Sequence, residues 1–378
     1  MSGSSNTKPT MGGNAMLGKI ILDLPPSPGN PRNSEGAMLR LNDGSILFIY
    51  SRFCGSDAAD DAAADLYALI SDDEGEHFHS LGPVVFHAET SAKNVMSVSL
   101  LRMENGDIGL FYLERRGETD MRMMLRRSAD EGRTWTDPAI CMPNSGYYVV
   151  NNDRVLRLCS GRILLPAALH RLSLRDDGST RFDSRADFLC VYSDDDGRTW
   201  REGAGKCALA PAGPSQTGLQ EPGVVELEPG MLWAWARTDL GRQYETFSLD
   251  GGETWTPAAP SAFTGPMSPL SIKRLPDGSL LAVYNPIPLY NGRPEIVNGV
   301  WTGGRTPLCL ARMRNRTQSA PHPIAIEDDP ASGYCYVSIF PAKDGVLLSY
   351  CAGGPNDGSC LNRLRIRKIR YEELPAEA

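Results

Sequence analysis

An eight-residue pattern recurs along this chain and constrains its fold more than any other feature. Ser-x-Asp-x-Gly-x-Thr-Trp occurs in full at 128–135, 193–200 and 248–255, and a fourth copy at 71–78 ends in Phe instead of Trp. The Ser and Asp side chains can bond the N–H groups of a tight turn, and Gly supplies its left-handed position. Each copy, which we call a box, therefore predicts a β-hairpin, with Trp135, Trp200 and Trp255 buried under neighbouring strands.

A second repeat lies beside the boxes and sets the number of structural units. It consists of a strand, a Gly-containing turn and a second strand, and its six copies cover 34–52, 97–115, 152–171, 220–237, 268–286 and 336–351. Six units that can each supply four strands predict an all-β, six-bladed β-propeller with four antiparallel strands per blade. We expect strand 18–24 to pair into the blade that contains 336–371 and to close the ring. Residues 19–378 are then a single domain behind a flexible tail, residues 1–18.

Composition and charge narrow the classes of partner. The net charge is −8, from 46 acidic and 38 basic residues, which disfavours nucleic acid as a partner. No apolar run is long enough to span a bilayer, and the polar N-terminus does not resemble a signal peptide, which favours a cytoplasmic location unless a leader has been removed. The nine scattered cysteines favour neither a disulfide framework nor a zinc site. The boxes lack the ligand pattern of a calcium loop, so we expect neither a metal nor a cofactor.

Polar side chains gather at corresponding places in the six hairpins. In a propeller, the starts of the inner strands and the ends of the strands that follow them lie on one rim. The starts are Glu35, Ser97, Asp153 with Arg154, Glu221, Ser268 and Tyr336, and the ends include Arg52, Glu114, His170, Arg237, Asn285 and Tyr350. Groups of both charge signs in one cleft are typical of acid–base chemistry on a polar, anionic ligand.

The boxes, together with the segment from Gln220 to Trp255, resemble the sialidase (neuraminidase) superfamily, over most of the chain from residue 19 onward. The resemblance implies a six-bladed propeller that acts on glycans. It assigns Glu221 and Arg237, sixteen residues apart, to the family's Glu and its carboxylate-binding Arg. Arg305 matches a second such Arg, and Tyr336 matches the family's nucleophile, with Tyr334 as the weaker alternative.

The implied reaction is exo-acting, retaining cleavage of a terminal sialic acid or a related acidic sugar. A neutral Tyr can approach an anionic anomeric centre without charge repulsion, and Glu221 would take the phenolic proton. The family's acid lies on the first blade's loop, where Asp60 and Asp61 are our choices. We expect Glu221, Arg237, Arg305 and Tyr336 to converge, with the Tyr336 hydroxyl in hydrogen-bond reach of Glu221.

The sequence departs from the family at its first carboxylate-binding Arg. Arg32 stands two residues before the aligned position. The sequence leaves three alternatives. Arg32 turns into the site, or Arg52 or Arg154 takes its place, or the ligand has no carboxylate at this position. Glu35 on the same rim would repel a carboxylate unless an arginine pairs with it.

Two other functions remain open from the sequence. One is a hydrolase or lyase for another sugar that uses Glu35, Asp153 and His170. The other is a propeller that binds glycans without catalysis, for which the arginines and aromatic rings suffice and no acid–base pair is needed. The oligomeric state is not encoded in any motif of the chain.

Overall fold

The protein is all-β in a computed structural model that describes residues 16–209, 215–289, 294–316 and 322–377. The helical elements that lie wholly within these ranges are two three-residue 3-10 turns, η1 (His87–Glu89) and η3 (Tyr371–Glu373). The strands follow the short apolar runs between Gly-containing turns that the sequence repeats, because such runs fit a sheet buried between neighbours.

Four sheets have four strands each and are antiparallel throughout. The first contains, in spatial order, β2 (Asn33–Arg40), β3 (Ile46–Phe53), β4 (Ala64–Ser71) and β5 (His79–Val85). Another contains β15 (Gln220–Glu228), β16 (Met231–Arg237), β17 (Arg242–Ser248) and β18 (Ala259–Thr264). The next contains β19 (Ser271–Arg274), β20 (Leu280–Tyr284), β23 (Leu308–Met313) and β24 (Ile324–Glu327).

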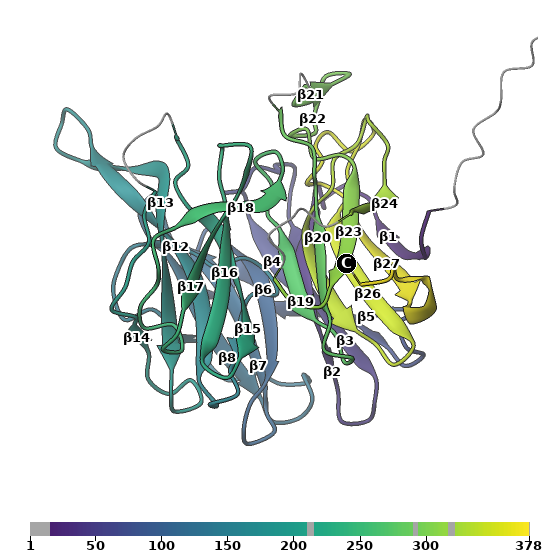
Figure 1. Cartoon of the computed structure of the whole chain (residues 1–378), viewed down its shortest axis with the longest axis horizontal. Coiled ribbons are helices and arrows are strands. Elements are labelled where there is room, and N and C mark those ends of the chain that lie inside the picture. Colours follow the sequence, from purple (N-terminus) through teal and green to yellow (C-terminus); the bar gives the residue numbers. More distant parts are fainter. Residues whose placement is uncertain (1–15, 210–214, 290–293, 317–321, 378) are drawn as a thin grey trace, which may run out of the picture.

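The fourth of these sheets joins the two ends of the chain. It contains β25 (Cys335–Pro341), β26 (Gly345–Cys351), β27 (Leu364–Arg370) and β1 (Lys19–Leu24). Strand β1 pairs antiparallel with β27, and Figure 1 shows the purple β1 beside the yellow β27. The predicted pairing of the N-terminal strand with the unit at 336–371 is therefore confirmed.

The second and third repeat units form one nine-stranded sheet, which the sequence did not predict. One half contains β6 (Asn94–Arg102), β7 (Ile108–Arg115), β8 (Met121–Ser128) and β9 (Ala139–Ile140). The other half contains β11 (Leu156–Arg157), β12 (Ile163–Leu174), β13 (Thr180–Ser193) and β14 (Arg201–Glu202). The short β10 (Tyr147–Val149) joins them, pairing parallel with β8 and antiparallel with β12. A small hairpin of β21 (Ile296–Val297) and β22 (Val300–Trp301) lies between β20 and β23 in sequence and stands at the top of Figure 1.

The boxes form the hydrogen-bonded turns that their residues predict. In the box at 128–135, Asp130 accepts hydrogen bonds from the Thr134 backbone N–H at 2.8 Å and from its hydroxyl at 2.6 Å. The Ser128 hydroxyl oxygen accepts from the N–H of Gly132 at 2.8 Å, and Gly132 has a φ of 88°. The glycine is needed because an L side chain rarely adopts this backbone conformation.

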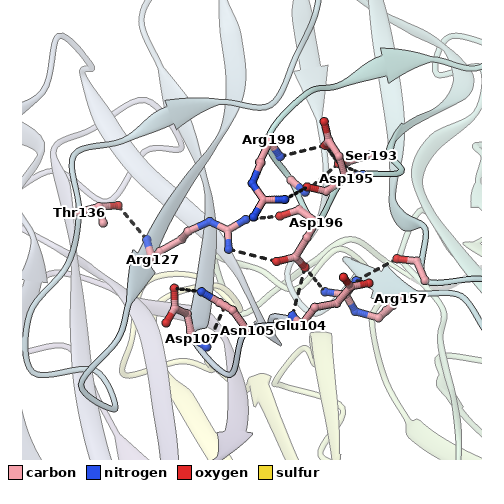
Figure 2. A network of polar contacts seen from close by, with 12 residues as sticks. Glu104, Asn105, Asp107, Arg127, Thr136, Arg157, Ser193, Asp195, Asp196 and Arg198 are labelled. Atoms are coloured by element: carbon pink, nitrogen blue, oxygen red, sulfur yellow. Dashed lines mark hydrogen bonds and ion pairs between the residues drawn. The ribbon is translucent and has the colours of Figure 1, made fainter.

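The fourth box residue, which the sequence pattern left open, ties adjacent repeat units together. It is Glu74, Glu131 and Asp196 in the first three boxes. Glu131 pairs with Arg102 of its own unit at 2.6 Å and accepts hydrogen bonds from Asn42 in the turn of the preceding sheet. Asp196 pairs in the same way with Arg157 at 2.6 Å and accepts from the Glu104 N–H, while Arg127 approaches it from β8, as Figure 2 shows. We call these contacts the box latches.

The box tryptophans are less buried than predicted. Trp135, Trp200 and Trp255 are half-buried and pack against the core from its edge, because each ends a surface turn and keeps one side accessible. The fully buried tryptophans are instead Trp233 and Trp235 of β16.

The predicted N-terminal tail is described only at its end, from residue 16 onward. Residues 1–15 of the predicted tail lie outside the described residues, whereas Leu17 and Gly18 contact the body: both backbone oxygens accept hydrogen bonds from Arg367. In the part of the chain that the structure describes, no helix has the length and apolar character needed to cross a membrane.

Candidate functional site

The first strands of several sheets begin with the same backbone irregularity. The pairing register shifts between Met96 and Ser99 in β6, between Gln220 and Gly223 in β15, and between Cys335 and Ser338 in β25. The residues at or near these shifts have left-handed backbones, with φ of 58° at Ser97, 48° at Glu221 and 57° at Tyr336. A bulge of this kind changes the direction of a side chain, and such strain concentrates at functional sites.

Tyr336, Glu221 and Arg237 form a connected group. The Tyr336 hydroxyl donates to Glu221 Oε1 at 2.9 Å, and Arg237 Nη1 lies 2.7 Å from Glu221 Oε2. The first distance is within the reach that the sequence analysis requires. Burial, reinforced by the negative charge of Glu221, raises the pKa of Tyr336 well above its ordinary value. The phenol is therefore neutral at rest and has a proton acceptor in contact with it.

Arg305 lies against the same tyrosine. Its guanidinium carbon is 5.4 Å from the centre of the Tyr336 ring and 4.9 Å from that of Trp301. Its Nη2 donates to the Met267 carbonyl at 3.1 Å, and its Nη1 donates to Cys335 Sγ at 3.0 Å. The four residues that the sequence expected to converge do lie together.

Arg32 turns inward and supplies the cation expected at the first blade. Its Nη1 donates to Asp60 Oδ1 at 2.6 Å, its Nη2 donates to the Ser34 hydroxyl at 3.1 Å, and Glu35 lies 4.0 Å away. Burial raises the pKa of Glu35 despite the charge of Arg32. The Asp60 side chain is 65% exposed, and its ion pair with Arg32 lowers the pKa of Asp60.

A cavity of about 190 Å³ lies between the group around Arg32 and the group of Tyr336, Glu221 and Arg237. Arg32, Glu35, Asp60, Glu221, Arg237 and Tyr336 all line it. Its remaining wall is largely apolar or aromatic and includes Met96, Leu113, Met121, Tyr147, Val149 and Phe182. The space thus combines a charged side, which suits an anion, with an apolar side, which suits a less polar part of the same ligand.

His170 lines the cavity as a neutral ring. It packs against Phe182, with ring centres 4.8 Å apart, and its Nδ1 is 3.3 Å from the Asp183 carbonyl. Burial lowers the pKa of His170 to about 4. A histidine with this pKa is not charged near neutral pH.

Asp153 and Arg154 lie in a different cavity, of about 350 Å³. Both oxygens of Asp153 contact Lys273 Nζ, at 2.6 and 2.7 Å, and Oδ2 also accepts from the Ile339 N–H. Arg154 donates to the Leu270 carbonyl, and burial lowers its pKa to about 10. The structure therefore separates Asp153 from Glu35 and His170, with which the sequence analysis grouped it.

The other predicted site residues, Arg305 included, are not among the residues that line the 190 Å³ cavity. The Arg52 guanidinium covers the Tyr67 ring at 4.6 Å, and the Asn285 amide is bonded to Ser268 and to the Pro307 carbonyl. Asp61 is exposed on the loop next to Asp60.

Several residues that line this cavity were not predicted from the sequence, among them the polar Arg115, Asn151 and Gln220. Arg115 follows Glu114 at the end of β7, and among the described residues no carboxylate forms an ion pair with it. Asn151 is 3% exposed, and its Nδ2 has no hydrogen-bond partner in the described structure. Arg115 could have been found by considering both residues at the strand end, whereas no sequence signal marks Asn151. No group of metal-ligating side chains suited to an ion occurs among the residues described.

Comparison with known proteins places the chain in a family. The profile of the BNR repeat-like domain matches residues 83–348. The chain belongs to this family. It is a BNR-repeat protein of the sialidase superfamily, so the resemblance drawn from the boxes is confirmed.

Two curated relatives are sialidases by name. The chain is 29% identical to Sialidase-4 of Homo sapiens over 157 residues, which cover 38% of this chain and 30% of that protein. It is 24% identical to Anhydrosialidase of Macrobdella decora over 280 residues, which cover 68% of this chain and 33% of that protein. The chain thus spans about a third of the length of each relative.

Solved structures share the fold at low identity. The intramolecular trans-sialidase from Ruminococcus gnavus superposes with a TM-score of 0.65 at 14% identity, covering 92% of this chain and 96% of that chain. A protein of unknown function from Dyadobacter fermentans superposes with a TM-score of 0.67 at 18% identity, covering 93% and 99%. These likenesses show a sialidase-type all-β fold.

Proposed function

We propose that the protein is an exo-acting, retaining glycoside hydrolase of the sialidase type that removes a terminal sialic acid or a related acidic sugar. The observation that carries the proposal is the 2.9 Å contact between the Tyr336 hydroxyl and Glu221, beside Arg237 and Arg305. A neutral phenol, a carboxylate positioned to take its proton and guanidinium groups for an anion are the parts this reaction needs.

In the first step, the Tyr336 oxygen attacks the anomeric carbon while its proton passes to Glu221. The glycosidic bond breaks, and the leaving oxygen takes a proton from an acid. In the second step, water attacks the same carbon and loses its proton to the carboxylate of that acid, and Tyr336 recovers its proton from Glu221. Two inversions at one carbon retain its configuration.

We assign the acid to Asp60, which lines the cavity from the loop between β3 and β4. Its ion pair with Arg32 opposes protonation in the free site. A substrate carboxylate bound by Arg32 would offset that positive charge and let the pKa of Asp60 rise.

The assignment predicts that Asp60→Asn depends on the leaving group. The variant should lose most activity on an alkyl sialoside and little on one with a nitrophenol leaving group, which departs without protonation. Glu35, whose pKa is raised, offers the matched variant Glu35→Gln. If Glu35→Gln shows the leaving-group dependence and Asp60→Asn does not, Glu35 is the acid.

We also propose that the six strand units are the blades of one closed propeller domain formed by residues 19–378. In support, strands of neighbouring units contact one another: β2 with β6 and β25, β12 with β15, and β19 with β15 and β25. The second and third units are joined through β10. Such a ring would place strand starts that are far apart in sequence around a single space.

The alternative enzyme, with Glu35, Asp153 and His170 acting together, has less support because Asp153 is paired with Lys273 in another cavity. A non-catalytic glycan binder would not need the Tyr336–Glu221 contact. Incubation with a fluorogenic sialoside, beside a panel of other aryl glycosides, tests all three. We expect release from the sialoside alone. Release from a different glycoside supports the alternative enzyme, and binding without release supports the glycan binder.

A further inference from the structure

Three cysteines lie directly behind the tyrosine of the candidate site. Cys335 precedes Tyr336 in β25, Cys351 is the register partner of Cys335 in β26, and Cys360 completes a buried cluster that Tyr336 and Trp301 also contact. None of the three thiols is more than 1% exposed. The chemistry proposed above does not use them.

Arg305 brings a positive charge into this cluster. The residue is 3% exposed, and among the described residues no carboxylate lies within ion-pair distance of it. Its two hydrogen-bond acceptors are the neutral Met267 carbonyl and Cys335 Sγ. A buried cation without a counter-ion is costly, and the Cys335 sulfur is the one acceptor of the two that can carry a negative charge.

The surroundings of Cys335 suit an anion. Burial alone would raise its pKa, but hydrogen bonds from Cys351 and Cys360 and the positive charge of Arg305 hold the pKa of Cys335 well below its ordinary value. The pKa values of Cys351 and Cys360 are raised, first through those hydrogen bonds to Cys335. The contact of Cys335 Sγ with Arg305 Nη1, at 3.0 Å, therefore makes Cys335 the thiolate position of the cluster.

We propose that Cys335 is a thiolate that pairs with Arg305 and holds its guanidinium in place beside Tyr336. Cys335 is thus a positioning residue, which acts on the ligand through Arg305. The inference about the ion pair stands on the cluster itself, and only its consequence for binding rests on the proposed function. Arg305 is not among the residues that line the 190 Å³ cavity, so this consequence requires its oriented guanidinium to reach the substrate's anionic group from beside the Tyr336 ring.

The pair can be tested by ultraviolet absorbance, which distinguishes a thiolate from a thiol without any turnover. The folded protein at neutral pH should show one thiolate more than Cys335→Ser, and the signal should vanish on acidification or unfolding at neutral pH. Cys309→Ser, which removes a buried thiol from β23, should leave the signal unchanged. Equal thiolate absorbance in the wild type and in Cys335→Ser would overturn the proposal. Loss of the signal in Cys351→Ser would also overturn it, because the thiolate would then be Cys351 and Cys335 would be a thiol.

Binding and kinetics then test the positioning role. Cys335→Ser should raise KM for a fluorogenic sialoside, and Kd for free sialic acid, by roughly tenfold or more, the scale of a lost charge-assisted hydrogen bond. The change in kcat should be smaller, and Cys335→Asp, which restores an anion, should recover part of the affinity. Unchanged affinity in a folded Cys335→Ser variant would contradict the role. If the thiolate is present but neither ligand binds to the wild type, the proposed function fails and the ion pair stands.

Discussion

The same left-handed backbone occurs in two regions of the molecule, with different consequences. One region is the box latches, where the non-glycine residues with positive φ are Glu74, Glu131 and Asp196. The other is the start of the first strands, where they are Ser97, Asp153, Glu221 and Tyr336. The latches contact turns at the far ends of the first strands, so the two regions are about a strand length apart, roughly 25 Å for eight residues.

In the latches, the carboxylates of the strained residues are paired with groups of the protein itself. Both oxygens of Glu131 accept hydrogen bonds from Arg102 and from Asn42. The oxygens of Asp196 are engaged by Arg157, Arg127 and the Glu104 N–H (Figure 2). All four carboxylate oxygens of Glu131 and Asp196 therefore have partners within the described structure.

At the strand starts, the strained residues are also paired, but polar atoms of other residues at the same cavity are not. Buried nitrogen atoms of Arg32, Asn151 and Arg237 that line or adjoin the cavity have no partner in the described structure. Since buried polar groups are normally satisfied, the unpaired atoms around the cavity favour a site there, although the indole nitrogens of Trp200 and Trp255 in the boxes are unpaired as well. Variants in the two regions should therefore affect different measurements.

The largest effect is expected at Tyr336. Tyr336→Phe removes the attacking oxygen and no charge, so turnover of a fluorogenic sialoside should fall by about 10³-fold or more. Affinity for free sialic acid should change little. Tyr334→Phe is the matched control, because Tyr334 packs in the core against Tyr350. Equal losses in the two variants would remove the distinction between site and core.

In the latches, the largest effect is expected at Asp196. Asp196→Ala leaves Arg127 and Arg157 without their buried counter-ion, and the free energy of unfolding should fall by about 3 kcal/mol. Asp194→Ala, in the same box, removes a 53% exposed partner of Arg162 and should cost less than about 1 kcal/mol. Chemical denaturation checks both. A loss of sialic acid affinity in folded Asp196→Ala would break the separation between the regions.

A smaller effect is expected from the buried, neutral His170. Its pKa is lowered to about 4, so below the ordinary histidine pKa of about 6.5 the unfolded chain binds a proton that the folded chain does not. Stability should fall as the pH drops from 6.5 towards 4, and above this window His170 contributes no pH dependence. His170→Gln should reduce that slope in denaturation curves, whereas His322→Gln, at an exposed histidine, should not. An unchanged slope in His170→Gln would show that His170 is protonated in the folded state.

The smallest effect is expected where the latch is missing. In the box at 248–255, Gly251 occupies the position that is acidic in the other boxes. Its φ of 66° is close to the 59° of Glu131 and Asp196. An added Cβ would meet Arg162 Nη1 at 3.8 Å, an ordinary contact. Gly251→Asp should therefore change the free energy of unfolding by no more than about 1 kcal/mol, because backbone strain and a new ion pair offset each other. A loss above about 3 kcal/mol would mean that this box cannot accept a latch.

Much of the fold could be predicted because short-range residue spacing within each repeat determines its turns and strands. The box turns, the strand units and the pairing of the N-terminal strand follow from Ser, Asp and Gly spacing and from apolar runs. The nine-stranded sheet could not be predicted, because β10 has three residues and one register contact with β8. The partial exposure of the box tryptophans depends on how far each surface turn projects, which no spacing shows.

The site was predictable where equivalent positions in the repeats led to it. Glu221, Arg237 and Tyr336 could be placed because each starts or ends a strand of a recognisable hairpin. The pairing of Asp153 with Lys273 joins residues 120 positions apart, and the sequence around Asp153 does not predict it. Arg32 likewise could be placed only once its contacts with Asp60 and Glu35 were known.

The central claim is that Tyr336 attacks the anomeric carbon, and trapping the covalent intermediate tests it most directly. A 3-fluorosialosyl fluoride should transfer its sugar to the enzyme and slow the second step, because the fluorine disfavours the positive charge that develops at the anomeric carbon. Proteolysis and mass spectrometry should then find the adduct on Tyr336, and none in Tyr336→Phe. An adduct on Glu221 or Glu35, or rapid turnover by Tyr336→Phe, would contradict the account.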